Sequence, residues 1–239
     1  MMTGKRYFSY AAEIIERFPQ IRAGAILARD LSSGPTPEVL HRLFEEEQRK
    51  TTERIGDTPP SEIESLAAWR AAFRAFGVNP TKTRSAPEAL LRRLSKKGDI
   101  PSINTLVDIG NLISIRYALP TAVFDTGQLQ GGITVRFAEG DERFTPIFAK
   151  EAQNPEAGEV IFCDEDDTVV ARRWCWRQSD ESAAREDTTE AIIVMEAQHE
   201  GSEGMVQAAL DDWLAMLAEF TGGELKSGLL SKEQTMISE

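Results

Sequence analysis

Three polar residues share one side of an otherwise apolar segment, residues 103–119. Asn104, Asp108 and Asn111 are spaced by four and three positions, so they lie on one face if the segment is a helix. Asn and Asp are unfavourable inside helices, and their presence needs a reason. They either line a polar substrate pocket or form an internal hydrogen-bond network, and the sequence leaves both open.

Arginine and tryptophan alternate in a second candidate segment, residues 172–178. If this segment continues a strand, its two faces would carry Arg172, Trp174 and Trp176 on one side and Arg173, Cys175 and Arg177 on the other. Such interleaving is typical of surfaces that stack on bases and pair with phosphate. The alternative is a pair of core tryptophans with arginines along the sheet edge.

A third candidate is the strand predicted over residues 121–125, which ends at Asp125. Pro120 precedes it, and Gly127, Gly131 and Gly132 follow, so a ligand could approach the backbone closely at this turn. Asp125 is therefore added to the expected substrate-pocket residues. An ordinary hairpin explains the same pattern.

The sequence contains no signature that identifies a catalytic group. It has no Ser-centred nucleophile elbow, no phosphate-binding loop and no dinucleotide fingerprint. Its two histidines, His41 and His199, and its two cysteines show no metal-ligand spacing. The catalytic residues stay unknown, and we expect neither a metal nor another cofactor.

The charge is uneven along the chain. The formal net charge is −12, which argues against tight non-specific binding of nucleic acid. Residues 82–97 nevertheless contain six basic residues and one acid, Glu88, so one basic face is compatible with an acidic protein. No apolar run approaches the roughly 20 residues of a membrane span, and the N-terminus has no apolar stretch long enough for a signal segment, so we expect a cytoplasmic protein without membrane contact.

The order of predicted elements favours an α+β fold. Helical patterns dominate residues 36–119, strands dominate residues 121–196, and a helix is predicted over residues 205–220. We therefore expect an N-terminal helical half packed on a mixed, mainly antiparallel sheet. Residues 1–226 are predicted to form a single domain, and residues 227–239, which lack a clear apolar period, a mobile tail.

Several of these segments together resemble a known family. The order and spacing of residues 84–94, 103–111, 119–125, 158–160 and 172–178 are similar to stand-alone relatives of the third and fourth domains of the phenylalanyl-tRNA synthetase β subunit. The resemblance covers roughly residues 73–197. Many of these relatives carry Asn where this chain has Cys175. In the synthetase this module binds tRNA and hydrolyses tyrosine wrongly attached to phenylalanine tRNA, which implies a related α+β fold here.

The resemblance suggests a tRNA-binding protein that could release a wrongly attached amino acid. An aminoacyl ester is already activated, so a positioned water can suffice. In this hypothesis Asn104, Asp108, Asn111 and Asp125 line the substrate pocket. The RNA 3′ end would be held by a second set of residues: Arg84, Arg92, Arg93, Arg173, Trp174, Trp176 and Arg177. The alternatives are a non-catalytic RNA-binding module and a binder of a free amino acid or derivative.

Overall fold

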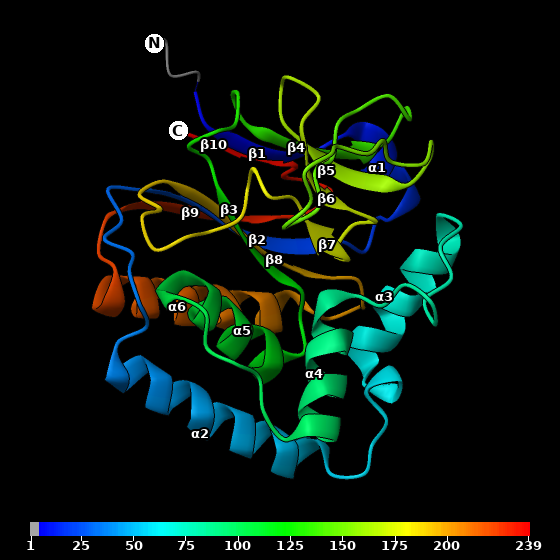
Figure 1. Cartoon of the computed structure of the whole chain (residues 1–239). Coiled ribbons are helices and arrows are strands. Elements are labelled where there is room, and N and C mark those ends of the chain that lie inside the picture. The colour runs from blue at the N-terminus through cyan, green and yellow to red at the C-terminus, as the bar shows by residue number, and fades with distance from the viewer. Residues whose placement is uncertain (1–4) are drawn as a thin grey trace.

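The chain folds into two β-sheets and a layer of helices, as described for residues 5–239 by a computed structural model (Figure 1). One sheet has the strand order β10 (Met236–Ser238), β1 (Tyr7–Tyr10), β4 (Ile133–Phe137), β5 (Val160–Cys163), β6 (Val169–Arg172) and β7 (Arg177–Gln178). The other has the order β3 (Thr121–Asp125), β8 (Ala191–Ala197), β2 (Arg22–Arg29) and β9 (Glu224–Leu230). All adjacent strands are antiparallel except β1 and β4.

The helices are α1 (Ala12–Arg17), α2 (Glu38–Ile55), the short 3-10 helix η1 (Pro60–Glu62), α3 (Glu64–Ala75), α4 (Ala86–Lys97), α5 (Thr105–Tyr117) and α6 (Glu203–Phe220). Helices α5 and α6 cover one face of the four-stranded sheet, and α2 packs on α5 (Figure 1). The predicted α+β class with a mainly antiparallel sheet is confirmed. Within residues 5–239, no helix combines the length and apolar character needed to cross a membrane.

The four-stranded sheet is buried on both faces, which explains why β8 is almost entirely apolar. Successive side chains of a strand point to opposite sides. Ile193 and Met195 therefore belong to the core cluster between this sheet and the helices. Ile192 and Val194 belong to the cluster that contains residues of the six-stranded sheet. By the same alternation, Glu196 lies on the side of Ile192 and Val194, between the two sheets.

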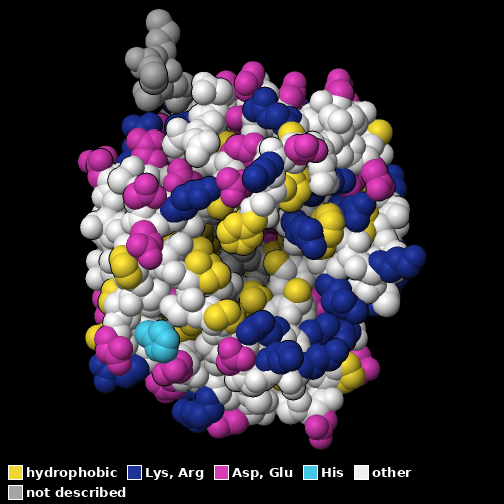
Figure 2. Space-filling view, viewed as in Figure 1, with side chains coloured by type: hydrophobic (Ala, Val, Ile, Leu, Met, Phe, Trp, Pro, Cys, Tyr) yellow, Lys and Arg dark blue, Asp and Glu magenta, His cyan; other side chains and the backbone are white. Residues whose placement is uncertain are grey.

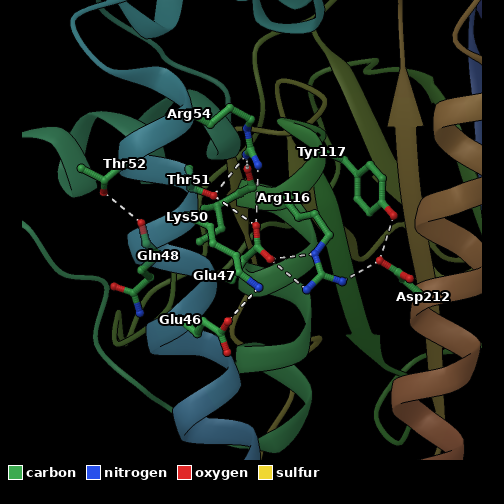
Figure 3. Close-up of polar contacts among 11 residues, drawn as sticks. Glu46, Glu47, Gln48, Lys50, Thr51, Thr52, Arg54, Arg116, Tyr117 and Asp212 are labelled. Atoms are coloured by element: carbon green, nitrogen blue, oxygen red, sulfur yellow. Dashed lines mark hydrogen bonds and ion pairs between the residues drawn. The ribbon is translucent and has the colours of Figure 1, made fainter.

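A polar network fixes the helical layer (Figure 3). The guanidinium of Arg116 on α5 lies 2.8 Å from Glu47 on α2 and 2.7 Å from Asp212 on α6. The Tyr117 hydroxyl donates to the same Asp212 carboxylate at 2.8 Å. Burial and this carboxylate raise the pKa of Tyr117 to about 12. These contacts join three helices into one layer beneath the sheet.

The expected mobile tail is corrected by the structure. Residues 224–230 form β9, which pairs with β2 along its whole length. Residues 236–238 form β10, which pairs with β1 at the edge of the other sheet. Ile237 packs partly against the core between the sheets. The sequence of β9 shows no alternation of apolar and polar residues, because β9 is an edge strand in which only Leu230 is fully buried.

The expectation that residues 172–178 continue a strand is also corrected. Strand β6 ends at Arg172, and the chain turns back through Arg173 and Trp174, whose φ angles are +47° and +61°. The amide of Trp176 closes this turn by donating to the carbonyl of Arg172 at 3.2 Å. The alternating faces expected here are therefore not formed, because non-glycine residues occupy left-handed conformations that end the strand.

Candidate functional site

A cavity of about 70 Å³ lies where β3, β7 and β8 approach the first residue of α4. Its walls are largely apolar and include Phe124, Phe162, Trp174 and Val194. Arg177 is the exposed residue of this wall, and with the neighbouring half-buried Trp176 it marks what we call the mouth of the cavity. Figure 2 shows a hollow near the middle of this face of the molecule. The arrangement is that of a small, mostly apolar chamber with few polar groups, the lining typical of ligand sites in a smaller volume than most of them have.

Glu196 is the one carboxylate among the residues that line the cavity. It is buried, and its Oε1 accepts hydrogen bonds from the Tyr10 hydroxyl at 2.5 Å and from the Trp174 indole nitrogen at 2.9 Å. Burial raises the pKa of Glu196 to about 7, and the two donors oppose this rise only in part. Both donors bind Oε1, so Oε2 has no hydrogen-bond donor among residues 5–239 and is available to a ligand.

Cys175 contributes a thiol to the cavity wall. Burial, and then the nearby Glu196, raise its pKa well above the usual range, so the thiolate is disfavoured. The carbonyl of Cys175 accepts a 2.7 Å hydrogen bond from the amide of Ala86. That bond ties the turn to the start of α4. The raised pKa keeps the Cys175 thiol protonated, and among residues 5–239 no hydrogen bond joins it to a base, so it is not an activated nucleophile.

The mouth carries a cation that is available to an anionic ligand. The guanidinium carbon of Arg177 lies 4.6 Å from the centre of the Trp176 ring, and the side chain is exposed. Arg173 lies 4.8 Å from the same ring but is paired with Glu159 and Glu156, each at 3.0 Å. Within residues 5–239 Arg177 has no ion-pair partner, so it is the better candidate for a phosphate contact.

Helix α4 presents the predicted basic face beside the cavity. Its inner side is organised by Glu88, a fully buried carboxylate that lies 3.0 Å from Arg70, 2.9 Å from Arg92 and 3.9 Å from Arg84. On the outer side, Arg93, Lys96 and Lys97 are exposed. Figure 2 shows Lys and Arg side chains gathered next to the hollow, over α4. The basic face and the cavity therefore open on the same side of the molecule.

The structure places two of the expected pocket residues at the start of α5. Asn104 is the residue before the helix, and its side chain accepts a hydrogen bond from the Val107 amide at 3.0 Å. Asp108 is fully buried and accepts hydrogen bonds from Thr36, from Ser102 and from the amide of Ile103. Both side chains satisfy backbone and hydroxyl donors, and neither lines the cavity beside Trp174.

The remaining predicted residues are also separated. Asn111 is half-buried on α5, and Asp125 accepts hydrogen bonds from the Gly127 amide and the Thr188 hydroxyl. Trp174 is fully buried and so has no face free for a base, whereas Trp176 is half-buried at the mouth. The structure therefore brings Trp176 and Arg177 to the cavity but leaves the four expected pocket residues outside its wall.

Sequence reasoning missed Glu196 as a candidate. Its signal was a single acidic residue in the apolar run Ala191–Ala197. A charged group in such a run is costly unless it is paired or serves a ligand. Tyr10 and Trp174, which hold it, lie in segments far away in the chain, so the local sequence gives no indication of its partners.

Comparisons with known proteins show the family to which this chain belongs. The model of the B3/4 domain family matches residues 68–222. The β subunit of phenylalanine–tRNA ligase from Colwellia psychrerythraea is 36% identical over 39% of this chain and 11% of that protein. The Fusobacterium nucleatum subunit is 23% identical over 93% of the chain and 30% of the protein. This chain thus spans less than a third of the length of these relatives.

The solved structures include an N-terminal fragment of the phenylalanyl-tRNA synthetase β subunit from Pyrococcus horikoshii. The match covers 91% of this chain and 49% of the fragment, with 13% sequence identity and a TM-score of 0.46. The family model accounts for well over half of the chain, including the cavity residues from Ala86 to Glu196. The chain belongs to the B3/4 domain family and is a module similar to that of the phenylalanine–tRNA ligase β subunit.

Proposed function

We propose that this protein binds the 3′ end of an aminoacylated tRNA, with the amino acid side chain in the cavity and the RNA backbone along α4. The observation that supports this most directly is the continuity of the two surfaces. Ala86 both begins α4 and lines the cavity, and Arg177 stands at the mouth. A ligand with a small side chain and an adjoining polyanion would match both.

The overall charge is compatible with this proposal because the cations are concentrated. The chain carries a net charge of −12, so phosphate is repelled from most of its surface. Arg93, Lys96 and Lys97 are exposed on α4 and offer a local attraction, although Arg93 also lies 3.4 Å from the exposed Asp99. Specific docking on one face is then favoured over non-specific coating, and binding should weaken as salt concentration rises.

The reaction we propose is hydrolysis of the ester that joins the amino acid to the terminal ribose. Water adds to the ester carbonyl carbon, the bond to the ribose oxygen breaks, and that oxygen leaves with a proton. The products are a free amino acid and an unacylated RNA. Because the cavity wall offers no activated nucleophile, the contribution of the protein would be to hold the ester and a water in position.

Glu196 would recognise the side chain of the amino acid. Glu196 is the carboxylate that lines this cavity, so it is the group best placed to hydrogen-bond a polar side chain there. Its position is fixed by Tyr10 and Trp174, so Oε2 would face the ligand without reorganisation.

The proposal is tested by measuring the release of amino acid from a panel of aminoacyl-tRNAs. The panel includes phenylalanine tRNA that wrongly carries tyrosine. We expect release above the spontaneous rate for at least one member, reduced in Arg177→Gln. Binding measured in the same samples separates the alternative. Salt-sensitive tRNA binding without release would favour a non-catalytic RNA-binding module, which the absence of an activated nucleophile also supports. Neither binding nor release across the panel would contradict both functions.

A further inference from the structure

We propose that the cavity selects a short side chain bearing a hydroxyl group, the serine and threonine class, and disfavours an aromatic ring. This inference rests on the proposed function, because it names the amino acid that the site would take. It differs from the tyrosine specificity that the resemblance implies. The argument depends on the volume of the cavity, the rigidity of its walls and the one carboxylate among its lining residues.

The volume of the cavity is too small for a phenol. It measures about 70 Å³, whereas a cavity that accommodates benzene has a volume of about 150 Å³. By this comparison the cavity holds roughly three non-hydrogen atoms, half of the six in benzene. The side chain of threonine has that number beyond the α carbon, and that of serine has one fewer. Tyrosine would have to place a ring and a hydroxyl in the same space.

The walls resist widening because they belong to the core between the sheets. Phe124 and Trp174 have no exposed surface, and Phe162 is 2% exposed. The rings of Phe124 and Phe162 are in contact, with centroids 5.5 Å apart, and Trp174 packs at 5.2 Å on Trp69. Close-packed interiors accommodate added atoms only by displacing side chains and backbone, so a ring would be admitted at a cost in affinity.

The polar group of the cavity requires a hydrogen-bonding partner. Oε2 of Glu196 has no donor among residues 5–239, and the rest of the inner wall is mostly apolar. A purely apolar side chain such as that of alanine would leave this oxygen dehydrated and unpaired. A side-chain carboxylate would place two acidic groups together. A hydroxyl satisfies Oε2 whether Glu196 is charged or protonated, because a hydroxyl both donates and accepts.

Binding of non-hydrolysable analogues tests the inference separately from catalysis. The probes are 3′-amino-3′-deoxyadenosines that carry serine, threonine, alanine or tyrosine through an amide bond, measured by calorimetry. We expect the serine or threonine analogue to bind about tenfold or more tightly than both the alanine and the tyrosine analogues. Equal or tighter binding of the tyrosine analogue would overturn the inference but leave the proposed function intact. No binding of any analogue would contradict both.

A pair of matched variants tests the role of volume. Val194→Ala removes two carbon atoms from the cavity wall on β8. Val123→Ala makes the same truncation on the neighbouring β3, in the core cluster between the four-stranded sheet and the helices. We expect Val194→Ala to shift the ratio of tyrosine to serine affinity towards tyrosine by about tenfold. Val123→Ala should leave the ratio unchanged. An equal shift in both variants, or no shift in Val194→Ala, would contradict selection by volume.

Discussion

The indole nitrogen of Trp174 donates a 2.9 Å hydrogen bond to Oε1 of Glu196, which lies 22 residues further along the chain. The bond depends on the turn after β6, where Trp174 adopts a φ of +61° and its ring lies in the core between the sheets. The turn therefore has two effects on the candidate site. It fixes the carboxylate in the cavity, and it places Trp176 and Arg177 at the mouth.

Removal of this donor should destabilise the fold beyond the loss of ring volume. In Trp174→Phe the buried carboxylate keeps only the Tyr10 donor, and a hydrogen bond to a charged or partly charged group contributes about 1.5–3 kcal/mol. Trp213→Phe is the matched control, since Trp213 is also fully buried but its indole nitrogen has no hydrogen-bond partner. Urea unfolding should show a larger loss for Trp174→Phe by about 1–3 kcal/mol. Equal losses would contradict the role of the bond.

The stability of the protein should depend on the titration of Glu196. Burial raises the pKa of this carboxyl from 4.5 to about 7. Between these values the folded protein keeps a proton that the unfolded chain has released, so this contribution to the free energy of unfolding is present below about pH 4.5 and is lost as the pH rises to 7. The slope is at most about 1.4 kcal/mol per pH unit.

The effect of this titration is isolated by comparing the unmodified protein with Glu196→Gln. Glutamine keeps an acceptor for Tyr10 and Trp174 but does not ionise. The free energies of unfolding of both proteins, measured by urea between pH 5 and 8, would give their difference at each pH. We expect the unmodified protein to lose stability relative to the variant as the pH rises. A difference that stays constant with pH would show that Glu196 titrates in its ordinary range.

The exposed cations of α4 should account for the salt dependence of RNA binding. Three of them can be neutralised to glutamine without touching the buried Glu88: Arg93, Lys96 and Lys97. Each lost phosphate contact should make the plot of log K against log salt shallower by about 0.7–0.9. The control removes three exposed cations from α2: Arg42, Arg49 and Lys50. The same change in both variants would indicate a general effect of net charge rather than a docking face.

Asp108 should affect stability and not ligand choice. In Asp108→Asn one of the two acceptor oxygens becomes a donor, although the surrounding groups are the donors Thr36, Ser102 and the Ile103 amide. We expect a loss of about 1–3 kcal/mol in the free energy of unfolding. The relative affinities for the aminoacyl analogues should not change. A changed preference among the analogues would return Asp108 to the substrate pocket.

The helical elements could be predicted because their signals are local. In α3 the apolar residues Leu66, Trp69 and Phe73 follow one another at spacings of three and four, which is the period of one helix face, and all three are buried in the structure. Helical period likewise separates the basic and apolar sides of α4, where Leu91 and Leu94 lie three positions apart and are both buried. Prediction failed for β9, since an edge strand buries little and so has no clear alternation.

The sequence by itself determined the α+β class, the helical stripes, the basic face of α4 and the membership of the family, because periodicity, charge and motif order are local or sequential properties. Only the tertiary structure decided where the cavity lies and which carboxylate lines it. Glu196 receives its donors from Tyr10 and Trp174, on separate elements, and its burial and raised pKa arise from that packing. Asp108 stands out more clearly in the sequence, yet the structure uses it as a hydrogen-bond acceptor at the start of α5. Its donors, Ser102 and the Ile103 amide, belong to the loop before that helix.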